Sequence, residues 1–112
     1  MQSVYSKIGR GICVLVCALC LHGCSEYQAL LKSKDPELKY QKALTYFNDK
    51  QYVKAQTLLD EVTPYYKGTD RSQDVLAYLS RCYIGQKDYI SAAEYYQAYI
   101  RNYPKGRYII EA

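Results

Sequence analysis

The sequence has no tryptophan, one histidine and three prolines among its 112 residues. The single histidine, His22, ends an apolar segment near the amino terminus, so residues 23–112 contain none. There is also no glycine-rich phosphate loop and no pair of carboxylates in a recognisable catalytic pattern. The 15 lysines and arginines are scattered rather than clustered, and the formal net charge is only +4. We therefore expect neither an enzyme nor a protein that binds nucleic acid.

Long apolar runs are lacking as well. The uncharged stretch ICVLVCALCL covers ten residues, 12–21, whereas a membrane-spanning helix needs about 20. The ten residues before it carry Lys7 and Arg10 and no acid, and Gly23 follows shortly after it. A basic start, a short apolar region and a small residue before a cleavage site are typical of a secretory signal peptide.

The end of this segment resembles the lipobox of bacterial lipoproteins. Residues 21–24 read LHGC, with leucine, glycine and cysteine in the family's positions and His22 where Ala, Ser, Thr, Val or Ile is usual. The resemblance implies that residues 1–23 are a signal peptide and that the Cys24 thiol carries diacylglycerol. It also implies fatty acylation, as with palmitate, of the new amino terminus. Residues 24–35 would then be a lipidated tether.

Two other interpretations of the segment remain open. One is an uncleaved membrane anchor, and the other is a metal or redox site formed by Cys17, Cys20, His22 and Cys24, since thiolates and imidazole are zinc ligands. Structural zinc sites usually draw their ligands from separated parts of a folded chain. Ligand thiols must also lose their protons, which an apolar segment disfavours. We therefore predict no metal site and no cofactor other than the covalent lipid.

Cysteine usage after the signal agrees with this interpretation. With Cys24 joined to lipid, Cys82 is the only other cysteine beyond residue 23, so no disulfide forms within the chain. Cys82 lies in an apolar-periodic stretch, which predicts a small buried packing residue. Removing Lys7 and Arg10 with the signal lowers the formal charge from +4 to +2.

The remaining chain contains an internal repeat. TYFNDKQYVKAQTLLDEVTPYY (45–66) aligns with CYIGQKDYISAAEYYQAYIRNY (82–103) at a constant offset of 37 residues. The aligned pairs are Tyr46 and Tyr83, Lys50 and Lys87, Tyr52 and Tyr89, Ala55 and Ala92, Leu59 and Tyr96, and Val62 and Tyr99. A fixed period between 20 and 50 residues indicates an array of supersecondary units.

Apolar residues within each unit recur every three or four positions, as on one face of a helix. Short polar links at 48–51 and 85–88 separate the helical stretches, and Asp35 followed by Pro36 is a typical helix start. The pattern predicts four helices, at 36–48, 52–66, 72–85 and 89–103.

The spacing of small and aromatic residues resembles the tetratricopeptide repeat. The family's positions are filled in the first copy by Ala43, Tyr46 and Ala55, and in the second by Ser80, Tyr83, Ala92 and Pro104. The first copy has Lys67 in place of the closing proline and carries Pro64 instead. The resemblance implies an all-α fold, an antiparallel helix-hairpin solenoid of about two repeats and the start of a third.

The last six residues, 107–112, follow Pro104-Lys105-Gly106 and read as the start of another first helix. Repeat arrays usually need about three units and a polar capping helix. We therefore expect that the repeat domain, 36–112, is incomplete at its carboxyl end and that the chain is an amino-terminal fragment of a longer protein, or else that a partner covers its end.

The tetratricopeptide resemblance also implies a binding groove lined by the first helix of each unit. Carried over residue by residue, the groove positions are Tyr40, Leu44 and Phe47 in the first unit, with Asp74, Ala77 and Arg81 in the second. For Leu44 and Phe47 a purely structural role in the core remains the alternative. Tyrosine suits such a surface because it gives a large contact area at low entropic cost.

The lipobox and the repeats together indicate a narrower class of protein than either motif does alone. A lipobox, the tether SEYQALLKSKDPELKY, the unit ALTYFNDKQYVKAQTLLDEV and the link YIRNYPKGRY together resemble the BamD-like lipoproteins of the outer-membrane β-barrel assembly machinery. This resemblance implies a scaffold anchored by lipid at the periplasmic face of the bacterial outer membrane. Its partners would be barrel-assembly subunits and outer-membrane protein precursors. The alternatives are another periplasmic repeat lipoprotein, such as a cell-wall or division scaffold, and a nutrient-binding surface lipoprotein.

Overall fold

The computed structural model describes residues 24–112, so the predicted signal peptide at 1–23 lies outside the described part of the chain. The chain divides into two units, Met1–Lys32 and Ser33–Ala112. Of the first unit only residues 24–32 are described, and they are helical. The second unit holds the predicted repeats.

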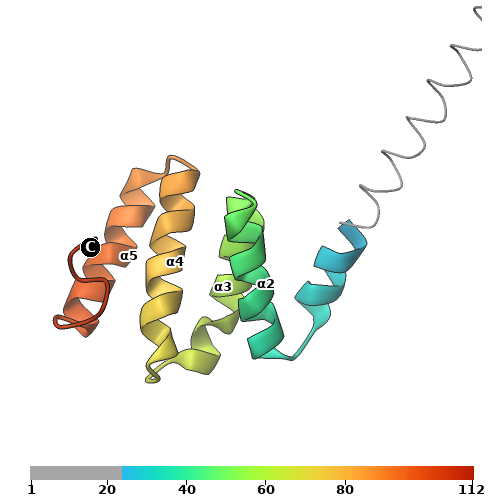
Figure 1. The fold of residues 1–112 in the computed structure, drawn as a ribbon, viewed down its shortest axis with the longest axis horizontal. Helices are drawn as coiled ribbons and strands as arrows, with labels where there is room; N and C mark the ends of the chain where they lie inside the picture. Colours follow the sequence, from blue (N-terminus) through green and yellow to red (C-terminus); the bar gives the residue numbers. More distant parts are fainter. Residues whose placement is uncertain (1–23) are drawn as a thin grey trace, which may run out of the picture. The chain divides into compact units, whose positions relative to one another are not determined.

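The second unit consists of four helices, α2 (Pro36–Asn48), α3 (Tyr52–Tyr66), α4 (Arg71–Gly85) and α5 (Tyr89–Asn102). Each helix packs against the next one along the chain (Figure 1). Residues 24–112 contain no strand, which confirms the all-α prediction for the part of the chain described. The predicted bounds of α2 and α3 are correct, α4 begins one residue earlier than predicted and α5 ends one residue earlier.

Aspartate side chains cap two of these helices. Asp35 Oδ1 accepts a hydrogen bond from Leu38 N at 3.2 Å at the start of α2, and Pro36 occupies the first helical position. Asp88 Oδ1 accepts from Ser91 N at 3.1 Å at the start of α5. Each carboxylate pairs an amide that the helix leaves without a partner, which explains why the helices begin at these residues.

The turn between α2 and α3 and the turn between α4 and α5 have the same geometry. Lys50 and Lys87, 37 residues apart, both adopt a positive φ, 62° and 61°. Two backbone hydrogen bonds close each turn, all of 2.9 Å: Lys50 N to Phe47 O and Gln51 N to Tyr46 O in the first, Lys87 N to Ile84 O and Asp88 N to Tyr83 O in the second. The sequence repeat is therefore also a repeat of local backbone structure.

Small residues occupy the buried helix contacts. Ala43, Ala55 and Ser80 have no exposed surface and Ala92 is buried. Helix axes approach closely only where side chains are short, so these positions admit little else. Larger buried side chains complete the core: Leu58, Leu59, Val62, Val75, Leu79, Cys82 and Tyr99.

Cys82 is a packing residue, as predicted. Its side chain is fully buried, and burial raises the pKa of the thiol to about 12. A thiol with this pKa is protonated at neutral pH and does not act as a nucleophile.

The prediction that residues 107–112 begin another helix is wrong for this structure, since the segment forms turns. One backbone hydrogen bond of helical spacing closes within it, from Ala112 N to Tyr108 O at 3.1 Å. A helix must form several consecutive bonds to offset the cost of nucleation. Here the side chains are held instead by polar contacts with α4 and α5.

Candidate partner-binding face

The six predicted groove residues lie on two helices. Tyr40, Leu44 and Phe47 are spaced by four and three residues along α2, and Asp74, Ala77 and Arg81 by three and four along α4. Residues at this spacing share one side of a helix. Because α2 and α4 are the first helices of successive hairpins, we describe these two sides together as the first-helix face.

Phe47 connects three helices. Its ring makes edge-to-face contacts with Tyr52 of α3, at 5.5 Å between centroids, and with Tyr78 of α4, at 5.2 Å. Both Phe47 and Leu44 are half-buried. Phe47 therefore packs the two hairpins together while keeping part of its surface exposed.

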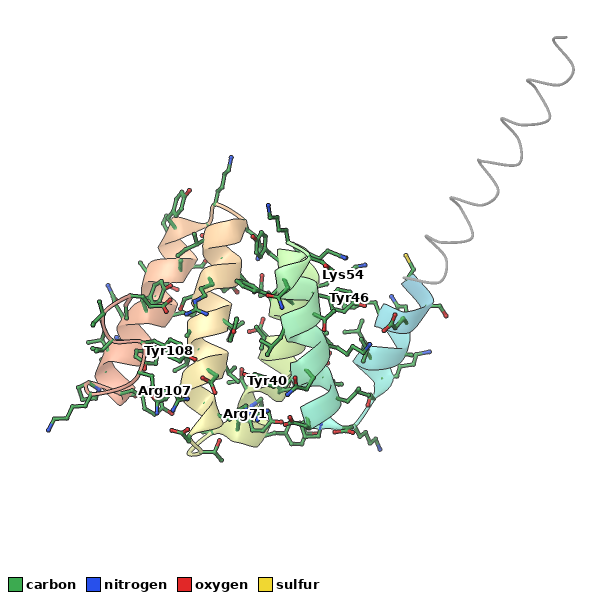
Figure 2. The ribbon with its side chains drawn as sticks, viewed as in Figure 1. Tyr40, Tyr46, Lys54, Arg71, Arg107 and Tyr108 are labelled. Carbon is green, nitrogen blue, oxygen red and sulfur yellow. The ribbon has the colours of Figure 1, made fainter. Side chains whose placement is uncertain are left out.

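Tyr40 is buried under a cation. The Arg71 guanidinium lies 4.3 Å from the centroid of its ring, and the ring of Tyr66 stands edge-on at 6.0 Å. Burial, followed by the negative charge of Asp74, raises the pKa of Tyr40 to about 12. Figure 2 shows Tyr40 and Arg71 close together beside α2 and α4. Tyr40 is therefore a packing residue of the first-helix face, and its buried ring is not accessible to a partner.

Glu37, Arg71 and Tyr66 form a polar cluster that the sequence did not reveal. Glu37 Oε2 accepts from Arg71 Nη1 at 2.6 Å and from the Tyr66 hydroxyl at 2.9 Å, while Gln41 donates to its other oxygen at 3.0 Å. The hydrogen bond from Gln41, then those from Arg71 and Tyr66, lower the pKa of Glu37 to about 2. A surface hollow of about 480 Å³ beside the cluster is lined by Glu37, Tyr66, Thr69, Asp70, Arg71 and Asp74.

On α4, Asp74 is occupied by the carboxyl-terminal segment, which we define as residues 103–112. Arg107 Nη2 donates to Asp74 Oδ1 at 2.9 Å, and the Tyr108 hydroxyl donates to the same oxygen at 2.5 Å. Arg107 also reaches Asp70 at 2.8 Å. One arginine therefore lies between two carboxylates, which raises the pKa of the Arg107 guanidinium.

Arg81 is held by the same segment. Its guanidinium donates two hydrogen bonds to Glu111, one of them from Nε at 3.0 Å, and lies 4.9 Å from the ring centroid of Tyr78 and 5.2 Å from that of Tyr108. Glu111 also accepts from the Tyr96 hydroxyl at 2.8 Å. Pairing with Arg81 lowers the pKa of Glu111, and the carboxylate raises that of Arg81.

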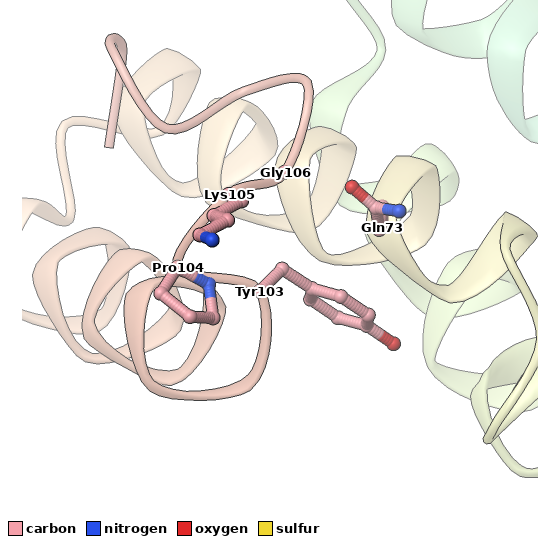
Figure 3. Close-up of a pocket in the computed structure, with 5 residues that line it drawn as sticks. All are labelled: Gln73, Tyr103, Pro104, Lys105 and Gly106. Atoms are coloured by element: carbon pink, nitrogen blue, oxygen red, sulfur yellow. The ribbon is translucent and has the colours of Figure 1, made fainter.

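A buried tyrosine fixes the start of the carboxyl-terminal segment. The Tyr99 hydroxyl donates to Gln73 Oε1 at 3.0 Å and accepts from Tyr108 N at 2.8 Å, and Gln73 also accepts from Arg107 N at 3.2 Å. Figure 3 shows Gln73 of α4 facing the turn that contains Gly106. A Cβ at Gly106 would collide with the Tyr99 hydroxyl and with Gln73 Oε1, so only glycine fits this close approach.

The structure thus brings part of the predicted set together. Phe47 and Tyr40 lie where α2 meets α4, and Asp74 and Arg81 lie under the carboxyl-terminal segment. Ala77 has no exposed surface and so offers nothing to a partner directly. Sequence reasoning missed two acids, Glu37 and Glu111, which were detectable because each lies 37 residues from the predicted Asp74.

The predicted lipid-attachment residue, Cys24, is exposed. Within residues 24–112 no helix combines the length and the apolar character of a membrane span. Over the same residues, no cluster of three or more His, Cys, Asp or Glu side chains is placed to hold a metal ion.

In comparisons with known proteins, no family model matches the chain and no curated protein matches it. The functional assignment therefore depends on the residues of the chain itself.

Proposed function

We propose that the protein is a lipid-anchored binding scaffold of the outer-membrane β-barrel assembly machinery, related to BamD-like lipoproteins and built from tetratricopeptide-like repeats. It is anchored through Cys24 at the periplasmic face of the bacterial outer membrane. The observation that carries the proposal is the combination of a lipobox at 21–24 with two helix hairpins of the same plan, 37 residues apart.

The tetratricopeptide assignment is supported by repetition at three levels. The aligned side chains recur every 37 residues, the small residues at aligned positions are buried, and the two turns share φ angles and hydrogen bonds. A solenoid of this kind presents its first helices side by side, which makes them a continuous surface for an extended or helical segment of a partner.

The first-helix face has the chemistry of a peptide-binding surface. It combines the half-buried Leu44 and Phe47 with the charged Asp74 and Arg81. In the carboxyl-terminal segment, the basic Arg107 and the hydroxyl of Tyr108 already satisfy Asp74, and Glu111, four residues after Arg107 and three after Tyr108, satisfies Arg81. An outer-membrane protein precursor with a basic or hydroxyl donor and an acid at this spacing would make the same contacts.

Co-purification tests the machinery assignment. The protein, extracted from outer membranes in mild detergent, is expected to retain barrel-assembly subunits and precursors. An Arg81→Glu, Asp74→Lys variant is expected to lose precursors, whereas Ile90→Ser, on the exposed surface of α5, is expected to keep them. Recovery of cell-wall or division proteins, or of a glycan with its transporter, would instead identify one of the two alternative lipoprotein classes.

Metabolic labelling tests the anchor separately. Cells given radioactive palmitate are expected to label the protein, and Cys24→Ala is expected to abolish the label and leave an uncleaved precursor. Cys82→Ala is the matched control, because the Cys82 thiol is buried and is not expected to carry lipid. Label entering the Cys24→Ala variant would refute the assignment of Cys24.

A further inference from the structure

The turn between α2 and α3 and the turn between α4 and α5 lie side by side at one end of the second unit (Figure 1). Gln86 of the second turn donates to Gln56 Oε1 near the start of α3 at 2.7 Å. It also lines a hollow of about 300 Å³ together with residues 50–54. We call residues 48–54 and 85–91 the turn edge.

A lysine occupies the strained position of each turn. Lys50 and Lys87 have φ values of 62° and 61°, a conformation that residues with a Cβ adopt at a cost and that glycine adopts freely. Both copies of the turn thus hold a lysine where glycine would be less strained. Strain of this kind at a corresponding position in both copies points to a use for the side chain itself.

An exposed aliphatic side chain follows each of these lysines by three residues. Val53 is 61% exposed and Ile90 is 79% exposed. Both lie in the first turn of a second helix, at the tip of a hairpin. The turn edge therefore presents the same pair, a cation and a β-branched apolar group, from two adjacent hairpins.

The lysines outnumber the acids at the turn edge. Lys54 adds a third ammonium group, which lies 5.5 Å from the ring centroid of Tyr46. The acids are Asp49 and Asp88, and both oxygens of Asp88 are held by Ser91, Oδ1 by its amide at 3.1 Å and Oδ2 by its hydroxyl at 2.8 Å. The formal charge at this end is therefore positive and complements an anionic partner.

The opposite ends of the helices differ. There Arg71 pairs with Glu37 at 2.6 Å, and Arg107 pairs with Asp70 at 2.8 Å. These arginines are satisfied within the chain. Lys50 and Lys87, in contrast, form no ion pair among residues 24–112.

The predicted tether is long enough to bring the turn edge to a bilayer, a step that rests on the proposed lipid anchor. Residues 24–32 are helical and residues 33–35 are not, so the tether reaches at most about 24 Å. Helix α2 has 13 residues, which places its end about 20 Å from its start. A lipid on Cys24 therefore leaves enough chain for the turn edge to contact the same membrane.

We propose that the turn edge docks on the phospholipid head groups of the membrane that holds the anchor. Lys50, Lys54 and Lys87 contact lipid phosphates, and the Val53 and Ile90 side chains enter the interface between head groups and acyl chains. Each lysine close to an anionic leaflet favours binding by about fivefold. Two hairpin tips in a row suit a flat partner, and the first-helix face, which lies along the sides of the helices, stays open.

Paramagnetic broadening by lipids tests this contact. The lipidated protein, with isotope-labelled valine and isoleucine methyl groups, is placed in nanodiscs of phosphatidylethanolamine and phosphatidylglycerol that contain a gadolinium-chelate lipid. The Val53 and Ile90 signals are expected to broaden, whereas Ile100, 41% exposed near the other end of α5, is expected to keep its intensity. In nanodiscs of phosphatidylcholine the broadening of Val53 and Ile90 is expected to fall by about half or more.

Two pairs of charge reversals separate the turn edge from general electrostatics. Lys50→Glu with Lys87→Glu is expected to reduce the broadening at Val53 and Ile90 by about fivefold or more. Lys67→Glu with Lys105→Glu, at exposed positions outside the turn edge, is the matched control and is expected to change it less than about twofold.

A glycine variant separates a lipid contact from a structural role of the lysines. Lys50→Gly with Lys87→Gly is expected to melt no lower than the parent, because glycine adopts a positive φ without strain. It is nevertheless expected to lose the broadening, as the glutamate variant does. Unchanged broadening in the glycine variant would overturn the proposal.

Failure of the anchor and failure of the docking give different results. A protein that separates from the nanodiscs in gel filtration contradicts the anchor, and broadening is then measured with nanodiscs in excess. Equal broadening of Ile90 and Ile100, or an equal loss in the matched control, would overturn the docking. So would a turn-edge variant that releases a co-purifying protein while its lipid contact is unchanged, since a protein is then the occupant.

Discussion

Replacing Tyr99 by phenylalanine removes one buried oxygen and leaves the ring in place. The Tyr99 hydroxyl makes two hydrogen bonds, to Gln73 Oε1 at 3.0 Å and from Tyr108 N at 2.8 Å, and the side chain has no exposed surface. A hydrogen bond contributes about 1 kcal/mol net, and a buried group left without its partner costs about 1–3 kcal/mol. Gln73 keeps its hydrogen bond from Arg107 N, so most of the lost stability comes from the Tyr108 amide, which is left without an acceptor. We expect Tyr99→Phe to lower the free energy of unfolding by about 2 kcal/mol.

Urea denaturation followed by circular dichroism at pH 7 measures this change, and hydrogen exchange of the Tyr108 amide locates it. The amide is expected to exchange much faster in the variant, whereas amides in the middle of α3 are expected to change only as much as global stability does. Tyr89→Phe is the control, because the Tyr89 side chain is 63% exposed. It is expected to alter the free energy of unfolding by less than about 0.5 kcal/mol.

Unfolding of Tyr99→Phe at the same urea concentration as the parent protein, with the Tyr108 amide still protected, would refute this role of the Tyr99 hydroxyl. That result would mean that the segment after α5 is held by its side-chain ion pairs rather than by the buried hydroxyl. A lower free energy of unfolding with an unchanged exchange rate of the Tyr108 amide would also contradict this role, since the destabilisation would then lie in the core and not at the carboxyl-terminal segment.

Three further perturbations test the fold and its electrostatics. Ala55→Glu and Ala92→Glu each bury an unpaired carboxylate, so each is expected to lower the free energy of unfolding, measured by urea denaturation, by more than about 3 kcal/mol. Ala93→Glu is the control and is expected to be tolerated, because Ala93 is exposed on α5. The pKa of Glu37 is about 2, against an ordinary 4.5, so its ionised form stabilises the fold above pH 4.5. This contribution is lost as the pH falls toward 2. We therefore expect Glu37→Gln to melt at a lower temperature than the parent at neutral pH, and we expect this difference to vanish in acid. Gly106→Ala is expected to lower the melting temperature by an amount equivalent to about 1–3 kcal/mol, and an unchanged melting temperature would contradict the close approach at this turn.

The helices were predictable because local signals and long-range periodicity agreed. Asp35 and Asp88 begin α2 and α5 through side-chain caps that depend only on neighbouring residues. The buried alanines were predictable for a different reason: Ala55 and Ala92 recur at the offset of the whole unit, and a position that must stay small in both copies indicates a close helix contact.

The polar contacts between hairpins were not predictable from sequence. The ion pair between Glu37 and Arg71 joins residues 34 apart, and its geometry depends on how two hairpins pack, which periodicity alone does not determine. The positive φ of Lys50 and Lys87 was equally hidden, because glycine and asparagine are the residues usually associated with this conformation. The turns at 107–112 were not predictable either, because side-chain contacts with α4, which the sequence pattern does not show, hold this segment.

The carboxyl-terminal segment is anchored unequally along its length, and the difference bears on the proposed binding face. At its start the Tyr108 amide is tied to the buried Tyr99 hydroxyl. At its end Glu111 is held through Arg81 by an ion pair whose side chains are both about one third exposed. Half-exposed ion pairs contribute about 0–1 kcal/mol, since solvent screens them and ordering long side chains costs entropy, and the two-bond geometry with Arg81 places this pair at the upper end of that range. Release of Glu111 breaks only half-exposed contacts, the two hydrogen bonds from Arg81 and the one from Tyr96, while the buried anchor at the Tyr108 amide stays in place. The proposed exchange of Glu111 for an acidic group of a partner therefore leaves the repeat beneath it folded.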